Sequence, residues 1–365
     1  MKLADLPTPC LVLDRLTLLR NIRSMANGIA RHGVPMRPHM KTAKSIEVAR
    51  LALIGQPGGI TVSTLAEAEY FASHGITDIL YAVGITPAKL DQVAKLNANG
   101  ANITVITDDL LAVDSIAAHP AGIKALIEID CGEQRGGVLV ASALLSELAT
   151  RLGGHLAGVM THAGHSYQGR NIEEIQQIAE LERSHVVYAA NRLRAEGHTV
   201  SVVSAGSSPT GRHATTMTGL TEFRAGVYMF GDLFQAELET HARDGIALSV
   251  LTSVIGVRDG RLLIDAGALA LSKDRSTEGS PRDYGFGLVL DIRGERALGG
   301  AIVQKAYQEH GVVELDPRNL IETPVGTKLR VLPNHACLTA AAHDRYHVVD
   351  GTDDVAAVWP RLNGW

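Results

Sequence analysis

Val34-Pro35-Met36-Arg37-Pro38-His39-Met40-Lys41-Thr42 follows a long amphipathic helical pattern and opens an alternation of strand and helix patterns that continues to residue 227. Residues two apart in a β-strand share a face, so Arg37, His39 and Lys41 are expected to point the same way. A lysine inside a barrel is costly to bury unless it is paired or used covalently. The alternative is that Lys41 ends a strand and extends its amine into solvent.

Eight short apolar stretches predict the strands of a parallel barrel. They are 36–41, 59–62, 78–83, 102–107, 124–130, 156–162, 200–206 and 222–227, and most of the gaps carry a helical pattern. Thr64 and Glu67, for example, form a capping-box signature before a helix that ends ahead of Gly75. Repeated strand–helix units without a linker favour a (β/α)₈ TIM-type barrel over an open doubly wound sheet. The active site of such a barrel lies at the carboxyl ends of its strands.

Helical periodicity largely disappears after Asp244. The segments 246–257, 262–266, 287–292, 300–303, 328–332 and 347–349 read as strands, and Asp259-Gly260 is a hairpin-turn signal. The sequence therefore predicts a barrel domain over 1–244 and a mainly antiparallel β domain over 245–365. A strand at about 8–13 is compatible with either domain.

Composition narrows the classes of partner. The chain has 365 residues, 45% of them hydrophobic, and a formal net charge of -5, so it offers a large core and no basic field for nucleic acid. No apolar run reaches the roughly 18 to 20 residues that span a bilayer. Three scattered cysteines and an N-terminus without a signal-peptide core predict a cytoplasmic protein. We expect neither nucleic acid nor membrane as a partner.

Two glycine-rich turns predict a phosphate site. The segments 204–210 and 224–228 follow the seventh and eighth predicted strands, where barrels commonly bind phosphate through backbone N–H groups. Either segment alone reads as an ordinary tight turn. Together with Lys41 at the first strand, they favour pyridoxal phosphate (PLP), whose aldehyde reacts with a neutral lysine amine.

Three further strand ends carry polar side chains. Arg135 lies in the polar loop after the fifth strand, where it can reach a cofactor oxygen or form a solvated ion pair. His162 and Tyr167 follow the sixth strand, and His162 is placed to pack beside a cofactor ring. On extended backbone His335 and Cys337 would face one side, as ligands of one metal ion or as a buried thiol beside a hydrogen-bonded histidine.

These motifs resemble the alanine racemase-like PLP enzymes of fold type III, and above all the D-threonine aldolase family and its metal-dependent D-serine dehydratase relatives. The resemblance covers nearly the whole chain. It is carried by Arg37-Pro38-His39-Met40-Lys41-Thr42 and by the segments 59–65, 81–84, 161–167, 224–228, 308–311 and 333–337.

The resemblance implies a role for each candidate residue. Lys41 would be the Schiff-base lysine, while His335 and Cys337 would hold a divalent metal, Mn²⁺ or Zn²⁺. For the cofactor ring, the resemblance implies contacts at Arg135, His162 and Tyr167, and for the cofactor phosphate a cradle at Gly206, Ser207, Gly226 and Val227. Outer-shell support of the metal would come from Gln308, Glu309 and His310, of which Gln308 and His310 are also candidate substrate contacts. The substrate carboxylate would bind Arg275 or Lys273.

The activity that the resemblance implies is D-threonine aldolase, which cleaves D-threonine to glycine and acetaldehyde by a retro-aldol reaction. The same site also suits a dehydratase of D-serine or D-threo-3-hydroxyaspartate, which would release ammonia and an oxo acid. An alternative of another class is a non-catalytic PLP-binding protein that manages cofactor supply. The resemblance also implies a homodimer.

Overall fold

The computed structural model describes residues 1–295, 297–315 and 323–365. The chain forms two compact units, one of residues 24–226 with 364–365 and one of residues 1–23 with 227–363. The division after Gly226 lies earlier than the boundary that we predicted at Asp244. Residues 227–244 cluster with the second unit because the backbone of Leu233 and Phe234 bonds Pro333 and Asn334.

The first unit is a parallel eight-stranded barrel, as predicted. Its path is β2-β10-β9-β8-β6-β5-β4-β3, and a short strand, β7, pairs with β6. An isolated bridge between His39 and Thr61 joins the two ends of the path, with the Met40 N–H donating to the Thr61 carbonyl at 2.8 Å. The strands are β2 (Met36–Pro38), β3 (Ile60–Val62), β4 (Asp78–Gly84), β5 (Asn102–Thr107), β6 (Lys124–Asp130), β7 (Val138–Leu139), β8 (Leu156–Thr161), β9 (Val202–Ala205) and β10 (Glu222–Ala225).

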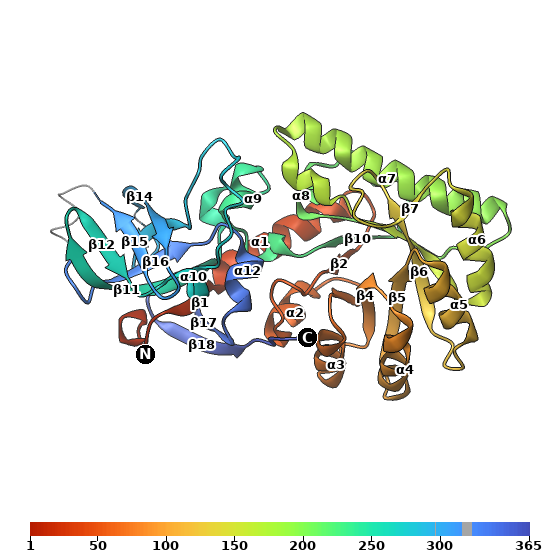
Figure 1. Cartoon of the computed structure of the whole chain (residues 1–365), viewed down its shortest axis with the longest axis horizontal. Helices are drawn as coiled ribbons and strands as arrows, with labels where there is room; N and C mark the ends of the chain where they lie inside the picture. The colour runs from red at the N-terminus through yellow and green to blue at the C-terminus, as the bar shows by residue number, and fades with distance from the viewer. Residues whose placement is uncertain (296, 316–322) are drawn as a thin grey trace. The chain divides into compact units, whose positions relative to one another are not determined.

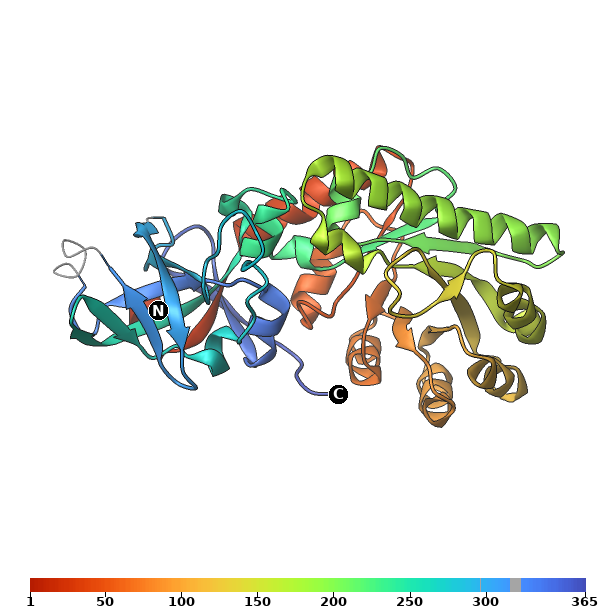
Figure 2. The same cartoon turned by 45° about the horizontal axis from the view of Figure 1, so that its top comes forward.

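Helices cover the outside of these strands (Figure 1). They are α1 (Arg15–Ala30), which precedes the barrel, α2 (Ile46–Ala52), α3 (Leu65–Ser73), α4 (Leu90–Ala98), α5 (Leu110–Ala118), α6 (Ala143–Leu152), α7 (Ile172–Ala195) and α8 (Ser208–His213). Figure 2 shows the orange and yellow helices α3 to α6 nearly end-on and α7 lengthwise. The predicted cap of α3 is confirmed, because the Glu67 N–H donates to Thr64, and at the start of α1 the Thr17 N–H donates to Asp14.

Inside the barrel, aliphatic side chains of neighbouring strands pack together. Leu80, Ile106, Leu126 and Met160 form one buried cluster. Nearly continuous apolar strands are typical of parallel sheets that are covered on both faces. No helix of the described residues is long and apolar enough to cross a membrane.

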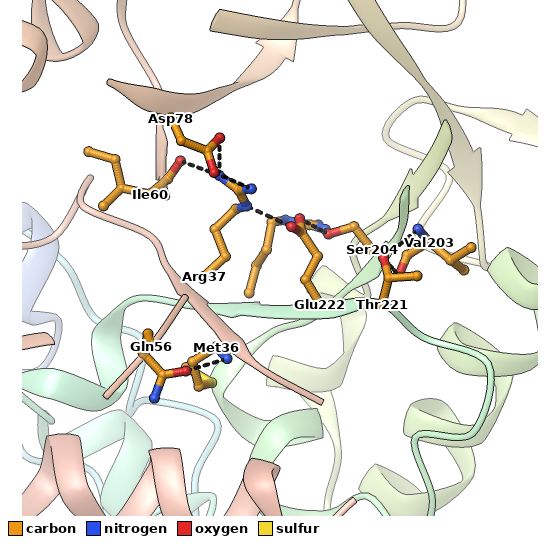
Figure 3. Close-up of polar contacts among 10 residues, drawn as sticks. Met36, Arg37, Gln56, Ile60, Asp78, Val203, Ser204, Thr221 and Glu222 are labelled. Atoms are coloured by element: carbon orange, nitrogen blue, oxygen red, sulfur yellow. Dashed lines mark hydrogen bonds and ion pairs between the residues drawn. The ribbon is translucent and has the colours of Figure 1, made fainter. Parts of the chain in front are cut away.

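A charged network lies at the amino ends of the strands (Figure 3). The Arg37 guanidinium donates to Glu222 at 2.7 Å and to both oxygens of Asp78 at 3.0 and 3.1 Å. Asp78 and Glu222 are the first residues of β4 and β10, so Arg37 points away from the carboxyl ends. Our expectation that Arg37 shares a face with Lys41 was wrong, because β2 ends at Pro38 and Lys41 lies in the turn beyond it.

Removing the carboxylate of Glu222 is expected to destabilise the barrel. Glu222 also accepts from the Ser204 hydroxyl at 2.6 Å, and Ser204 accepts from the buried Arg224. Glu222→Leu removes a carboxylate that pairs with Arg37 and acts on the buried Arg224, and breaking a buried pair costs about 3–5 kcal/mol in comparable sites. Urea unfolding measures the loss. Asp114→Ala, which breaks an exposed ion pair with Arg151, should cost less than about 1 kcal/mol.

The second unit is a mainly antiparallel β barrel with an added sheet. The strands β12-β15-β14-β13-β16-β11 close through a second pairing of β12 with β11, and β1-β17-β18 extend from β11. The strands are β1 (Cys10–Asp14), β11 (Leu248–Arg258), β12 (Arg261–Ile264), β13 (Leu288–Asp291), β14 (Ala297–Ala306), β15 (Gly311–Glu314), β16 (Lys328–Leu332), β17 (Arg345–Val349) and β18 (Val355–Pro360). Among the described residues, the connections carry the short helices α9 (Leu233–Glu237), α10 (Ala268–Leu271) and α12 (Ala336–Ala341).

The N-terminal strand belongs to this second sheet, where β1 pairs antiparallel with β11 and parallel with β17. The sequence predicted neither β15 nor β18. β15 has only four residues, too few to stand out as a pattern, whereas β18 is apolar throughout and the prediction overlooked it. The core of this unit includes Leu288, Leu332 and Tyr284.

Candidate active site

Lys41 lies just beyond the end of the first barrel strand, in a turn, and its side chain is exposed. The Lys41 N–H donates to Nδ1 of His39 at 3.3 Å, while the His39 ring also bonds the backbone of Thr61. Burial and the charges of Lys41 and Arg224 hold the pKa of His39 well below its usual range. His39 is therefore a neutral imidazole beside Lys41.

His162 is the second imidazole of this cluster. Its Nδ1 donates to the Gly206 carbonyl at 2.7 Å, which fixes the tautomer and leaves Nε2 without a proton. Burial lowers the pKa of His162 to about 3, and the charges of Lys41, Arg135 and Arg224 add to that effect. The structure thus brings Lys41, His162 and Arg135, three of the predicted cofactor residues, within electrostatic reach of one another.

Because these imidazoles are neutral in the folded state, we expect the cofactor-free barrel to become less stable to unfolding as the pH falls. A histidine with a depressed folded pKa binds fewer protons when folded than when unfolded, so stability rises with pH between the two pKa values. For His162 the window runs from about 3 to 6.5. We expect the urea midpoint to fall as the pH drops below about 6.5, and to fall less steeply in His162→Gln. An equal slope in both proteins would contradict the assignment.

Arg224 lies near His39 and His162, and we predicted it only as part of a glycine-rich turn. Its buried guanidinium donates to the Thr161 carbonyl at 2.7 Å and to the Ser204 hydroxyl. Its charge lowers the pKa of both His39 and His162. Burial lowers the pKa of Arg224 itself, and nearby carboxylates, Glu222 first, oppose that shift.

The two glycine-rich turns have the backbone geometry of a close-approach site. Gly206 has φ +142°, and a Cβ there would overlap the backbone of Arg224. A Cβ on Gly226 would lie 2.7 Å from the His39 carbonyl oxygen. Ser207 caps α8, and its hydroxyl lies 2.9 Å from that of Ser166. Val227, the last predicted cradle residue, begins the 3₁₀ helix Val227–Met229 of the second unit.

Glu182, on α7, hydrogen-bonds the backbone of these turns, and we did not predict its role from the sequence. One oxygen of its buried carboxylate accepts the N–H groups of Ala163 at 2.8 Å and Gly206 at 3.1 Å. The side chain also bonds Thr210, whose hydroxyl lies 2.9 Å from that of Ser207. The Gly206 N–H is therefore committed to Glu182 and does not serve a phosphate in this arrangement.

Arg135 and Tyr167 lie in neighbouring loops of the same unit. Arg135 is 58% exposed and forms ion pairs with Glu128 at 3.7 Å and Glu133 at 3.5 Å. Glu133 accepts the Gly164 N–H at 3.0 Å, which ties the Arg135 loop to the 3₁₀ helix Gly164–Gln168 that carries Tyr167. The ion pairs fit the solvated reading of Arg135, while its contact with a cofactor oxygen stays a prediction.

The predicted metal ligands lie in the second unit, on a backbone different from the one expected. His335 is the extended N-cap residue of α12 and Cys337 is inside that helix, so the extended His-x-Cys segment was wrong. The two side chains nevertheless hydrogen-bond each other. Nδ1 of His335 lies 3.5 Å from a carboxylate oxygen of Asp274, an orientation that leaves Nε2 for a metal.

Electrostatics fit a cation at this place. Burial lowers the pKa of His335, but Asp274 and Cys337 outweigh it and raise that pKa to about 11. Among the described residues no group of three or more His, Cys, Asp or Glu side chains could hold a metal ion. His335 and Cys337 would thus form a two-ligand site that leaves coordination positions for water and substrate.

The remaining candidates, Arg275, Lys273 and the segment 308–310, also lie in the second unit. Arg275 donates to Asp283 at 2.8 Å and stacks on Phe286, so its charge is already paired. Lys273 is exposed. The Gln308–His310 turn, Glu309 included, has exposed side chains, and its backbone bonds α10, with the Leu269 N–H donating to the Gln308 carbonyl at 3.2 Å.

Comparison with known families agrees with this arrangement. The N-terminal domain of alanine racemase matches residues 13–233, and a putative serine dehydratase domain matches residues 247–349. The chain belongs to the alanine racemase-like family of fold-type III PLP enzymes. Membership confirms the resemblance that the motifs indicated, together with the fold and the PLP dependence of the family.

Three relatives of this alanine racemase-like chain are lyases. D-threo-3-hydroxyaspartate dehydratase of Delftia sp. (strain HT23) is 41% identical over 100% of this chain and 99% of its own. D-serine dehydratase of Dictyostelium discoideum is 30% identical over 96% of this chain and 95% of its own, and 3-hydroxy-D-aspartate aldolase of Paracoccus denitrificans (strain Pd 1222) is 31% identical over 98% of this chain and 92% of its own. Both reaction types that the sequence left open thus occur among relatives.

Two solved structures of D-threo-3-hydroxyaspartate dehydratase are similar to this alanine racemase-like chain, each 40% identical with a TM-score of 0.97. They cover 100% of this chain and 97% and 100% of their own. One is a histidine-to-alanine mutant and the other a cysteine-to-alanine mutant in the metal-free form. The two mutated residues are two positions apart, which is the spacing of His335 and Cys337.

Proposed function

We propose that this chain is a PLP- and divalent-metal-dependent dehydratase of D-3-hydroxy amino acids, with D-threo-3-hydroxyaspartate as the first substrate to test. The observation that carries the proposal is full-length identity of 41% to a dehydratase of that substrate, combined with the His335–Cys337 pair. The sequence resemblance favoured D-threonine aldolase. Greater identity to the dehydratase than to the aldolase relative, at 31%, now favours elimination of water.

The barrel residues fit PLP. Lys41 provides an exposed amine at the strand ends, and His162 lies beside it as a neutral, apolar-faced imidazole. Gly206 and Gly226 keep the two turns free of side-chain atoms, and Ser207 and Ser166 supply hydroxyl groups near the Gly206 turn. When bound, PLP supplies an electron sink for negative charge at the substrate Cα.

The second unit fits a divalent metal. A thiolate and an imidazole oriented by a carboxylate are ligands that suit Zn²⁺, and Mn²⁺ is the alternative. When bound, the ion supplies a Lewis acid for the hydroxyl group of the substrate. Asp274 orients Nδ1 of His335, so that Nε2 is the nitrogen that a metal ion would bind in place of a proton.

In this proposal Lys41 Nζ moves a proton, taking it from the substrate Cα. The lowered pKa values of His39 and His162 make both imidazoles weak bases, so neither competes with Lys41 for that proton. The 3-hydroxyl group then leaves as water, taking up one proton in place of the one that Lys41 removed, and the enamine that remains becomes an oxo acid and ammonia by hydrolysis. Arg135, released from Glu128 and Glu133, is our candidate for an anionic oxygen of cofactor or substrate.

The second candidate function is aldol cleavage of the bond between Cα and Cβ at the same site, which similarity to 3-hydroxy-D-aspartate aldolase supports. D-threonine, giving glycine and acetaldehyde, is the substrate that the sequence resemblance implies. Loss of the hydroxyl proton would start cleavage, whereas loss of the Cα proton starts elimination. The two functions therefore differ in which proton the site removes first.

The deciding experiment incubates purified protein, PLP and Zn²⁺ or Mn²⁺ with D-threo-3-hydroxyaspartate, D-serine, D-threonine and L-threonine. Oxaloacetate with ammonia from the first substrate, lost on chelation, is the expected result. Glyoxylate or acetaldehyde with glycine would replace the dehydratase by the aldolase. Bound PLP without turnover of any substrate would favour the non-catalytic PLP carrier.

We also propose a homodimer, on resemblance to the family alone. Light scattering of the purified protein should give twice the mass of one chain. A monomer that turns over substrate would contradict the dimer and leave the dehydratase proposal standing.

A further inference from the structure

A buried carboxylate, Asp232, links two helix starts in the second unit. Asp232 is 1% exposed and directly precedes α9. One carboxylate oxygen accepts the Gln235 N–H at 2.8 Å and so caps α9. The other accepts the Ala336 N–H at 2.9 Å. Ala336 is the residue between His335 and Cys337, so this second bond reaches the predicted metal-ligand segment itself.

Backbone bonds reinforce this link. The N–H groups of Leu233 and Phe234 donate to the carbonyl oxygens of Pro333 at 3.0 Å and Asn334 at 3.3 Å. On the other side, the Asn334 amide donates to the Gly285 carbonyl at 2.6 Å and to that of Asp274 at 3.1 Å. The segment that leads into α12 is thus held from two directions.

The position of the helix start decides whether the two ligands converge. Residues two apart inside a helix point to nearly opposite faces, and only residues three or four apart share one. His335 and Cys337 approach each other because His335 still has extended backbone, with φ -136° and ψ 104°, while Cys337 is already helical. A shift of the helix start by one residue would separate them.

Asp232 is not a third ligand in this arrangement. Both of its oxygens accept backbone N–H groups, and the described residues include no group of three His, Cys, Asp or Glu side chains suited to a metal. Asp232 therefore acts on the metal-ligand segment through the backbone of Ala336, and its charge also acts directly on His335, whose pKa it helps to raise.

We propose that Asp232 is the positioning residue of the metal site, which fixes the start of α12 so that His335 and Cys337 can bind one divalent ion. This inference rests on the proposed function only in requiring a metal at that pair. A substitution of Asp232 that removes one acceptor oxygen should weaken metal binding and leave the PLP-binding barrel of residues 24–226 unchanged. Outer-shell substitutions of this kind typically lower metal affinity by about 10- to 100-fold.

The test uses Asp232→Asn and Asp232→Ser. In Asp232→Asn, the amide NH₂ group faces the N–H of either Gln235 or Ala336 and cannot accept a hydrogen bond from it. A serine hydroxyl can still cap α9 by accepting the Gln235 N–H, since serine is a preferred N-cap residue. Its shorter side chain cannot accept the Ala336 N–H at the same time. Asp109→Asn is the matched control, because Asp109 caps α5 in the barrel through the Ala112 N–H at 3.0 Å.

Zn²⁺ affinity of the PLP-loaded full chain is measured by competition with a chromophoric chelator, and the visible absorbance of bound PLP reports the barrel. We expect the Zn²⁺ dissociation constant to rise about 10- to 100-fold in both Asp232 variants, with unchanged PLP absorbance and no change in Asp109→Asn. Wild-type affinity in Asp232→Ser would overturn the inference and leave the proposed function intact. Absence of Zn²⁺ and Mn²⁺ binding in the wild type would overturn the metal site and the inference together.

Discussion

Lys41→Ala is expected to lower turnover of D-3-hydroxy amino acids by at least about 10⁴-fold, the scale seen when an enzyme loses the group that bonds covalently or moves the proton. The folded state should be almost unaffected, because the Lys41 side chain is exposed and lies in a turn beyond β2. A large loss of activity with unchanged thermal unfolding would therefore assign the effect to chemistry.

Steady-state kinetics and the visible absorbance of bound PLP measure the two consequences separately. Lys95→Ala is the control, since Lys95 is an exposed lysine on α4. If Lys41→Ala retained both the absorbance of lysine-bound cofactor and more than a tenth of the turnover, another amine would hold the cofactor.

The sequence predicted the barrel because each strand is a short apolar run with a helical pattern after it. Each of the eight predicted strands overlaps an observed strand, and the strand ends brought Lys41, His162 and Gly206 to one region. Parallel strands make this inference reliable, since the carboxyl ends of all of them meet at one face.

Side-chain direction beyond a strand end could not be predicted in the same way. Alternation applies only while the backbone stays extended, and β2 stops at Pro38. Arg37 therefore bonds Asp78 and Glu222 at the opposite end of the barrel. The same assumption placed His335 and Cys337 on a strand, whereas α12 begins between them.

The importance of Glu182 depends on tertiary contacts, but the sequence contains a signal for it. Ile175, Ala179, Glu182 and Val186 follow one another at helical spacing, and all four are buried. A carboxylate in the apolar stripe of a helix requires partners inside the protein, because an unpaired buried charge is costly. Those partners are the loops after β8 and β9, which no local pattern identifies.

Glu182→Ala is expected to reduce the free energy of unfolding by about 3–5 kcal/mol and to weaken PLP binding by at least about 10-fold. The N–H groups of Ala163 and Gly206 and the Thr210 hydroxyl would lose their acceptor, at about 1–3 kcal/mol for each buried group. Because the same groups shape the turns beside His162 and Ser207, cofactor affinity should fall with stability.

Glu182→Gln separates hydrogen bonding from charge. Its amide oxygen can still accept from Ala163 and Gly206, since one oxygen serves both, and its NH₂ group can donate to the Thr210 hydroxyl. Near wild-type stability in urea and near wild-type PLP affinity by absorbance titration are therefore expected for Gln. The exposed neighbour Glu180, paired with Arg183, gives the control Glu180→Ala, with a loss below about 1 kcal/mol. If Gln proved as damaging as Ala, the charge of Glu182 would be the feature that orders the turns.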